Sequence, residues 1–316
     1  MCSRFPSNFQ GAGSATPSPL STGERGKAVA LLLITALMAG CAHRAPAPAA
    51  SPPQPPRRVL HIAADPNNLP FSNDKLEGFE NKLAQLIAKD LDADVEYVWR
   101  AQRRGFFRHA FKEDGCEIIL GVPNHFEMAA TTAPYYRSSY VFLTRRDRNL
   151  HVTSFDDPAL RDMKIGLQVL GDADEGSGSP PGFALARRGL ANNIVGYTIY
   201  GDYREPNPPS CIVDAVAAGE VDVAVVWGPL AGYFARRSKV PLEVTPVSPL
   251  MEPPGLPFAF EISVGVKKGE PSLKEELNNV LARRRADIDR ILDEYGVPRV
   301  PLTAGAPKPN ESASAR

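Results

Sequence analysis

The sequence predicts an α/β protein built from two lobes that are joined by two crossing strands, with a cleft between the lobes. Three observations support this prediction. Apolar, strand-like segments alternate with amphipathic, helix-like segments in two separate series, which is the pattern of parallel sheets with helical crossovers. A long extended segment, 135–146, separates the two series. Two further strand-like segments near the C-terminus, 242–248 and 258–268, provide a return to the first series.

The first series lies between residues 58 and 123. Its first strand is apolar from Val59 to Ala63, and its first helix is indicated by Leu83, Leu86 and Ile87 at helical spacing. The predicted elements are a strand at 58–64, a helix at 78–91, a strand at 94–100, a short helix at 106–111 and a strand at 116–123.

The second series repeats this alternation. The predicted elements are a strand at 163–170, a helix at 182–190, a strand at 194–200, a helix at 211–220, a strand at 221–227 and a helix at 229–237. After the two return strands, the pattern predicts one long helix. It begins at Pro271, a favoured first helical residue, and ends at Gly296.

The N-terminus has the features of an export signal. Arg25 and Lys27 precede an apolar run that ends at Cys41, and this run is too short for an unaided membrane span. Two small residues directly before the cysteine resemble a lipobox. We therefore expect a lipoprotein signal peptide at 1–40 and a lipid on Cys41 as the sole link to the membrane. The alternative is ordinary secretion with an unmodified cysteine.

The domain organisation follows from these elements. The residues after Cys41 are rich in Pro and Ala and cannot pack a core, and the C-terminal residues are low in apolar content. Five parts are predicted: the signal peptide at 1–40, a tether at 41–57, a discontinuous first lobe at 58–141 and 247–298, a second lobe at 142–246, and a disordered tail at 299–316.

Composition and motifs argue against several function classes. The formal net charge is zero, which gives no sign of the basic patch that nucleic-acid binding requires. The chain contains no Walker loop, Rossmann fingerprint, nucleophile elbow or His-x-x-x-His pair, so we expect neither an enzyme nor a metal site. Cys116 and Cys211 begin separate elements, and a disulfide between them is left open.

The loop after the first strand is the first candidate for a functional site. The run Asp65-Pro66-Asn67-Asn68 ends the strand by turn chemistry, which does not explain its side-chain amides or the nearby Phe71. Ligands of open α/β sheets bind outside the carboxyl ends of the strands. We therefore expect this loop to line the cleft.

Aromatic, amide and charged side chains near other strand ends complete the expected cleft or partner-binding surface. Packing in the core is the competing interpretation for Phe71 and for one of two adjacent tyrosines. The proline-rich segment 201–210 is a candidate contact for a protein partner. The expected set is Asp65, Asn67, Asn68, Phe71, Arg103, Arg104, Tyr135, Tyr136, Arg137, Tyr140, Tyr200, Asp202, Tyr203 and Trp227.

Two resemblances sharpen this interpretation. The stretch "LHIAADPNNLPFSNDKLEGFENKLAQLIAKDL" resembles the opening of bacterial periplasmic solute-binding proteins, family 3. That resemblance implies a type II periplasmic-binding-protein fold over 58–298, closing on a ligand by hinge motion. The blocks "ADPNNLPFSN", "AQRRGFFR", "APYYRSSYVF", "YGDYREPNPP" and "VDVAVVWGPLAGYFARRS" resemble the MxaJ/XoxJ-type proteins associated with PQQ-dependent methanol dehydrogenases.

The narrower resemblance implies a non-catalytic periplasmic accessory of methanol dehydrogenase that acts by protein contact in maturation or activation. The alternative is a substrate-binding receptor that delivers a small ligand, not an amino acid, to an ABC permease. One departure from the expected pattern is Ala63, where relatives are expected to have a cysteine.

Ordinary amino-acid binding is disfavoured. Relatives hold the α-carboxylate with an Arg shortly before the Pro-Tyr pair, where this chain has His125 and Glu127. They hold the ammonium with an acid after strand 221–227, where this chain has Trp227. A buried carboxylate without its bidentate partner is costly. No resident cofactor is expected, and contact of PQQ, a planar tricarboxylate, with Arg103, Arg104 and Arg137 is a hypothesis.

Overall fold

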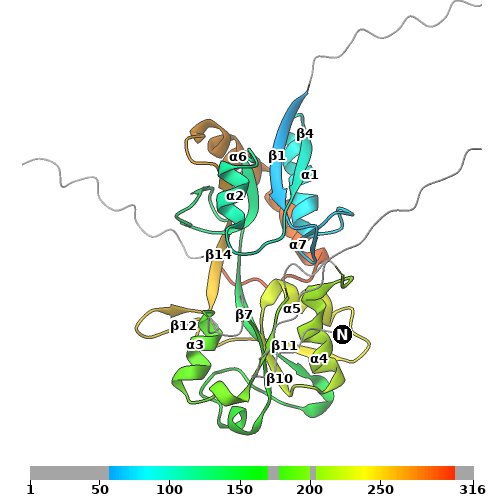
Figure 1. The fold of residues 1–316 in the computed structure, drawn as a ribbon, viewed down its shortest axis with the longest axis vertical. Helices are drawn as coiled ribbons and strands as arrows, with labels where there is room; N and C mark the ends of the chain where they lie inside the picture. The colour runs from blue at the N-terminus through cyan, green and yellow to red at the C-terminus, as the bar shows by residue number, and fades with distance from the viewer. Residues whose placement is uncertain (1–56, 170–177, 200–203, 303–316) are drawn as a thin grey trace, which may run out of the picture. The chain divides into compact units, whose positions relative to one another are not determined.

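The computed structural model describes residues 57–169, 178–199 and 204–302, and all structural statements refer to these residues. Fourteen strands are present among them (Figure 1). The strands are β1 (Arg58–Ala64), β2 (Asn67–Asn68), β3 (Ser72–Asn73), β4 (Ala93–Trp99), β5 (Ile118–Pro123), β6 (Ala130–Thr131), β7 (Tyr136–Arg145), β8 (Ile165–Gln168), β9 (Ile194–Tyr197), β10 (Val223–Trp227), β11 (Leu242–Pro246), β12 (Met251–Glu252), β13 (Leu256–Pro257) and β14 (Ala259–Val266).

The helices alternate with these strands in the two predicted series. The α-helices are α1 (Phe79–Asp90), α2 (Phe106–Lys112), α3 (Pro180–Arg187), α4 (Cys211–Ala218), α5 (Gly228–Ala235), α6 (Pro271–Arg283) and α7 (Arg285–Glu294). Short 3-10 turns are η1 (Arg146–Arg148), η2 (Pro158–Asp162), η4 (Ala191–Asn193) and η5 (Pro208–Ser210). No helix in the described ranges has both the length and the apolar character needed to cross a bilayer.

A mixed sheet with the strand order β4-β1-β5-β14-β7-β10-β8-β9 runs through both lobes. Strands β4, β1 and β5 are parallel in the first lobe, and β10, β8 and β9 are parallel in the second. The helices that connect parallel strands supply the crossovers that parallel pairing requires. The predicted fold class of two α/β lobes is therefore confirmed. The residue boundaries given above for the lobes remain a prediction.

Strands β7 and β14 are the two crossings (Figure 1). The first part of β7 pairs antiparallel with β14, where Tyr136 lies opposite Ile262. The second part of β7 pairs with β10, where Tyr140 lies opposite Trp227, and with β11. Strand β14 also pairs with β5 and β6 of the first lobe, whereas β7 continues into the ladder of the second lobe.

The start of α1 fixes the loop that follows β1. The backbone N–H of Phe79 donates to the Pro70 carbonyl at 2.8 Å, and that of Glu80 donates to the Phe71 carbonyl at 2.9 Å. A Cβ atom on Gly78 would lie 2.0 Å from the Phe71 carbonyl oxygen, so only glycine permits this approach. The residues 65–73, called the first loop below, are thus attached to the helix N-terminus.

The C-terminal helix differs from the sequence prediction. One long helix was expected to end at Gly296, whereas the structure has α6 and α7 with a break at Arg284, whose φ and ψ are −97° and 18°. Both Arg283 and Arg284 bind Asp90 at the end of α1, the latter with Nε 2.6 Å from Oδ1. Adjacent residues of a continuous helix point in different directions. The break allows both guanidinium groups to reach one carboxylate.

Candidate functional site

Asp65 is the residue that organises the first loop. Its carboxylate is buried and accepts two backbone hydrogen bonds, from the N–H of Asn67 at 2.8 Å and from the N–H of Gln102 at 2.7 Å. Burial raises the pKa of Asp65, and these two hydrogen bonds oppose that effect in part. Asp65 therefore joins the first loop to the segment between β4 and α2.

The two amides of the first loop have different contacts. Asn68 is buried, and its Nδ2 donates to Gln102 Oε1 at 2.8 Å, while its Oδ1 has no hydrogen-bond partner within the described residues. Asn67 is partly exposed, and its Nδ2 donates to the backbone carbonyl of Glu205 at 2.8 Å. Asn67 thereby connects the first lobe to the described part of the 201–210 segment.

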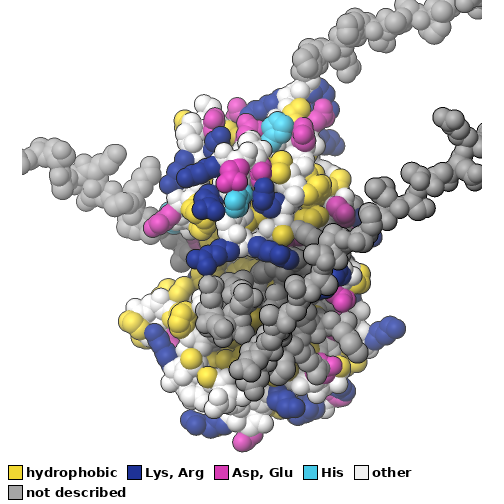
Figure 2. Space-filling view, viewed as in Figure 1, with side chains coloured by type: hydrophobic (Ala, Val, Ile, Leu, Met, Phe, Trp, Pro, Cys, Tyr) yellow, Lys and Arg dark blue, Asp and Glu magenta, His cyan; other side chains and the backbone are white. Residues whose placement is uncertain are grey.

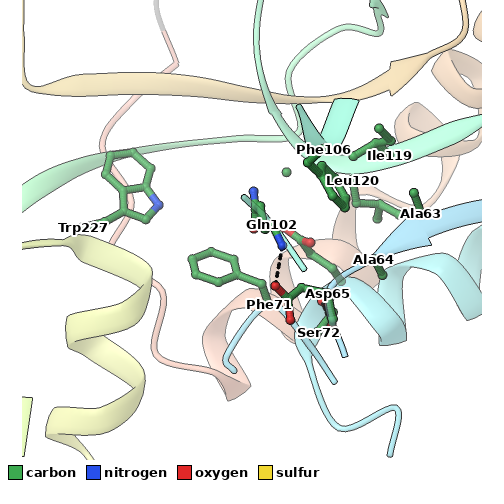
Figure 3. Close-up of a pocket in the computed structure, with 12 residues that line it drawn as sticks. Ala63, Ala64, Asp65, Phe71, Ser72, Gln102, Phe106, Ile119, Leu120 and Trp227 are labelled. Atoms are coloured by element: carbon green, nitrogen blue, oxygen red, sulfur yellow. Dashed lines mark hydrogen bonds between the residues drawn. The ribbon is translucent and has the colours of Figure 1, made fainter. Parts of the chain in front are cut away.

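A pocket with a volume of about 110 Å³ lies beside the first loop. Figure 3 shows Trp227, at the start of α5, on one side and Phe71 and Gln102 nearer the first lobe. The described residues that line this aromatic pocket are Ala63, Ala64, Asp65, Phe71, Ser72, Glu80, Gln102, Phe106, Ile119, Leu120, Gly121 and Trp227. Three residues of the expected cleft set, Asp65, Phe71 and Trp227, are in this lining. Phe71 also packs against Phe79, with ring centroids 5.4 Å apart.

Glu80 is the second carboxyl group of the aromatic pocket. Its side chain forms no hydrogen bond or ion pair with the residues that the structure describes. Burial raises the pKa of Glu80 to about 8. Although its carboxyl group lies deep in the first lobe, the residue keeps some solvent exposure because it faces the pocket. The pocket thus contains a carboxyl group that titrates close to neutral pH.

Gly121 makes room for this carboxyl group. The φ angle of Gly121 is +72°, and a Cβ atom at this position would lie 2.2 Å from Glu80 Oε1. Both the backbone conformation and the space therefore select glycine. The Gly121 N–H donates to the hydroxyl of Tyr135 at 3.3 Å, which places Tyr135 behind the pocket wall.

Trp227 belongs to an aromatic cluster at the crossing strands. The rings of Tyr140 and Trp227 meet edge to face at 5.5 Å, and Phe260 of β14 lies 6.0 Å from Trp227. All three side chains are partly exposed. Tyr140 was expected at the cleft, and the structure places it beside Trp227 without including it in the pocket lining.

A second, shallower site, called the basic hollow below, lies on the first lobe near the first loop and has a volume of about 440 Å³. Arg103 and Arg104, both expected at the cleft, are exposed and line it, and Trp99 stacks on Tyr97 at 4.6 Å. Figure 2 shows Lys and Arg side chains gathered over α2 on the face in view. The described lining of the hollow is Pro66, Trp99, Arg100, Ala101, Arg103, Arg104, Phe106 and His109.

Other predicted site residues lie elsewhere. Tyr135 and Tyr136 are both buried, 1% and 2% exposed, and Tyr136 packs edge to face on Phe79. Their expected place at the cleft is not what the structure shows, because both rings fill the core under α1. Arg137 donates from Nη1 to the Pro301 carbonyl at 3.0 Å and so holds the segment after α7.

Some predictions fall outside the described residues. This group consists of Tyr200, Asp202, Tyr203 and Cys41, the last of which is the predicted lipidation site. Cys116 and Cys211, whose pairing was left open, are both buried and are not bridged to each other. His125 and Glu127, which lie in sequence near the expected position of an amino-acid clamp, are exposed and are not in the described pocket lining.

Sequence reasoning missed Glu80 and Gln102. Glu80 has the pattern of an ordinary acidic residue in the first turn of a helix, where it would complement the helix dipole. Only the burial of its carboxyl group against Gly121 distinguishes it. Gln102 interacts mainly through its backbone N–H and its amide oxygen, and no sequence pattern marks those contacts.

Comparisons with known proteins give a consistent result. The family model of the bacterial extracellular solute-binding proteins, family 3, matches residues 60–298. Protein MoxJ of Paracoccus denitrificans is 31% identical over 263 residues, which cover 80% of this chain and 93% of MoxJ. The chain therefore belongs to the bacterial extracellular solute-binding proteins, family 3, and no enzyme family is indicated.

Two solved structures support the narrower resemblance. Periplasmic binding protein XoxJ from Methylobacterium extorquens AM1 is 36% identical, with a TM-score of 0.62 over 77% of this chain and 100% of that chain. MxaJ from Methlophaga aminisulfidivorans MPT is 26% identical, with a TM-score of 0.66 over 76% of this chain and 100% of that chain. The resemblance to MxaJ/XoxJ-type proteins is confirmed, and the family indicates a periplasmic location.

Proposed function

We propose that this chain is a non-catalytic accessory of a PQQ-dependent methanol dehydrogenase and acts by contact with that enzyme during its maturation or activation. The observation that carries this proposal is the similarity to MoxJ, MxaJ and XoxJ across most of the chain, at up to 36% identity. MxaJ/XoxJ-type proteins are those associated with methanol oxidation by quinoprotein dehydrogenases.

The geometry of the site supports a role other than amino-acid transport. The described pocket lining contains no Arg that could hold an α-carboxylate, and Trp227 stands where relatives place an acid. The surface near the first loop instead combines exposed Arg103 and Arg104 with Trp99. Arginine and aromatic side chains are enriched at protein interfaces. We propose that the dehydrogenase contact lies at the basic hollow and at residues 204–210, which the hydrogen bond from Asn67 to the Glu205 carbonyl holds near the first loop.

The experiment is affinity capture of the full chain from the periplasm of methanol-grown cells, followed by identification of the captured proteins. We expect the quinoprotein dehydrogenase to be recovered. Arg104→Glu should reduce its recovery, because it reverses one charge of the basic hollow. The matched control is Arg290→Glu, which reverses a charge on α7 that is 72% exposed, and it should leave recovery unchanged. Equal recovery with both variants would contradict the proposed surface.

We also propose that a lipid on Cys41 anchors the chain to the membrane on its periplasmic side. It would restrict the chain to the membrane surface while the tether at 41–57 gives the folded part reach. Cys41→Ser should release the protein into the soluble periplasmic fraction. An unchanged distribution between membrane and soluble fractions would contradict lipid anchoring.

The second candidate function is a receptor for a small ligand that feeds an ABC permease, and the aromatic pocket favours it. Capture of a permease in place of the dehydrogenase would support this function. A contact with PQQ would fall on the basic hollow, because the described lining of the aromatic pocket contains no Lys, Arg or His side chain to receive a carboxylate. A PQQ titration without heat and without a shift in melting temperature would remove that contact.

A further inference from the structure

The ionisable side chains that line the aromatic pocket are of the kind that binds cations. Its described lining contains the carboxyl groups of Asp65 and Glu80 and no Lys, Arg or His side chain. In sequence, the two internal segments outside the described residues, 170–177 and 200–203, also contain no basic residue. A ligand that carries a positive charge would therefore meet carboxyl groups in the lining. Arg103 of the adjoining basic hollow is the base that acts on Asp65.

Glu80 is the carboxyl group available to such a ligand. Asp65 has its oxygens occupied by two backbone N–H groups, whereas the Glu80 carboxyl group forms no hydrogen bond with described residues. Leaving a buried carboxylate without partners is costly. Gly121 preserves the space that this group occupies, since a Cβ atom there would lie 2.2 Å from Oε1. The structure therefore holds an unpaired acid at the pocket wall.

The other walls are aromatic. Phe71, Phe106 and Trp227 line the pocket, and Trp227 reaches it from the second lobe (Figure 3). Aromatic faces attract organic ammonium ions, and Trp does so most strongly. The volume of about 110 Å³ has room for a molecule of only a few heavy atoms.

We propose that this pocket binds a small organic ammonium ion, with Glu80 as its counter-ion and Phe71 and Trp227 as aromatic walls. The ion lacks the carboxylate of an amino acid, because the described lining offers no base to receive one. This inference goes beyond the proposed function and does not depend on a dehydrogenase. It would also specify the ligand class if the chain serves a permease.

The direction of the pH dependence separates this ligand class from a neutral one. The ionisable groups around Glu80 are Tyr97 of β4, Tyr135 and Tyr136 at the start of β7, and Asp65 after β1. With a pKa of about 8, Glu80 is largely protonated at pH 6 and ionised at pH 9. A cation binds the ionised form, so its affinity rises with pH. A neutral oxygen acceptor binds the protonated form, so its affinity falls with pH.

The test is isothermal titration calorimetry of the full chain with ethylammonium and with its neutral analogue ethanol at pH 6 and pH 9. Ethylammonium should bind roughly 100-fold more tightly at pH 9 than at pH 6, as a group with a pKa of about 8 requires. Ethanol should give no heat at either pH. Binding of ethanol that weakens at pH 9, or no binding of ethylammonium at pH 9, would overturn the proposal.

Variants locate the ion in the pocket. Glu80→Gln keeps the shape and removes the charge, so it should weaken ethylammonium binding at pH 9 by about tenfold or more and abolish the pH dependence. Glu96→Gln removes the same charge from the exposed face of β4, outside the pocket, and should bind as wild type does. If both variants bind alike, Glu80 is not the counter-ion.

Trp227→Leu tests the aromatic wall independently of charge. It should weaken ethylammonium about three- to tenfold at pH 9 and leave the pH dependence intact. Unchanged affinity would contradict an aromatic role.

Capture of the dehydrogenase by Glu80→Gln tests the proposed function separately. This variant should no longer bind the ammonium ion and should still recover the dehydrogenase, because the basic hollow is unaltered.

Discussion

Asp65 and Glu80 line the same pocket, yet the structure holds their carboxyl groups in different ways. Asp65 accepts backbone hydrogen bonds at 2.8 and 2.7 Å from Asn67 and Gln102. Glu80 has no hydrogen bond from the described residues and lies against the bare backbone of Gly121. Burial raises the pKa of both groups. The backbone hydrogen bonds of Asp65 oppose that rise in part, whereas Glu80 has no such hydrogen bond within the described part of the chain to lower its pKa.

This difference shows how one pocket can contain a structural acid and a functional acid. The Asp65 carboxylate replaces lost water with fixed backbone donors, so it can be both buried and ionised. The Glu80 carboxyl group has no such compensation and stays protonated in the folded chain until the pH approaches 8. A cationic ligand can therefore provide the partner for the Glu80 carboxyl group that the described residues do not provide.

The largest expected effect concerns the pH dependence of stability in Glu80→Gln. Burial raises the pKa of Glu80 in the folded chain to about 8, from the ordinary value of 4.5 that applies in the unfolded chain. As the pH rises, the unfolded chain therefore loses the Glu80 proton before the folded chain does. The contribution of Glu80 to the free energy of unfolding is fully present below pH 4.5 and is lost as the pH rises to about 8. Wild type should lose roughly 4 kcal/mol between these limits from this group. Glu80→Gln should not show this loss in urea unfolding at pH 5 and pH 8.5.

The exposed Glu96→Gln is the control for that experiment. Its unfolding free energy should follow wild type at both pH values, because its carboxylate is solvated in both states. If the unfolding free energy of Glu80→Gln also follows wild type at both pH values, ionisation of Glu80 does not destabilise the folded chain. That result would contradict the proposed difference between Glu80 and Asp65.

A smaller effect is expected for Asp65→Asn. The amide keeps one oxygen but turns an NH₂ group toward a backbone N–H, so one buried donor of the first loop or of Gln102 loses its acceptor. Unfolding at pH 7 should become easier by about 2–3 kcal/mol. The control Asp74→Asn changes an exposed residue and should stay within about 0.5 kcal/mol of wild type. A neutral result for Asp65→Asn would mean that the carboxylate does not hold the loop.

The smallest effect is expected for Gln102→Ala. This change removes the acceptor of the Asn68 Nδ2 group and keeps the backbone N–H that binds Asp65. The cost in unfolding free energy should be about 1 kcal/mol. A loss as large as that of Asp65→Asn would show that the side chain, not the backbone, connects the two segments.

The fold was largely predictable because hydrophobic periodicity determines the elements. The strand predicted at 58–64 is β1, and the helix predicted at 78–91 is α1 with its ends shifted by one residue. The break at Arg284 was not predictable, since the apolar spacing continues on both sides of it. Beside this break, Arg283 and Arg284 both bind Asp90, which lies far away in sequence.

The site was only partly predictable. Asp65, Phe71 and Trp227 stand at strand ends, where the topology of α/β sheets places ligands, and they line the pocket. The aromatic character of Tyr135 and Tyr136 suits a core as well as a cleft, and burial resolves that ambiguity. The importance of Glu80 depends on a glycine forty-one residues later in the chain, which local sequence patterns do not reveal.

The most direct measurement is a carbon-13 NMR titration of the Glu80 and Asp65 carboxyl groups, with and without ethylammonium. We predict that Glu80 titrates near pH 8 in the free chain and that ethylammonium lowers the pKa of Glu80 more than that of Asp65. A free Glu80 that titrates near 4.5, or a Glu80 pKa that ethylammonium leaves unchanged, would contradict the assignment of this residue as the counter-ion.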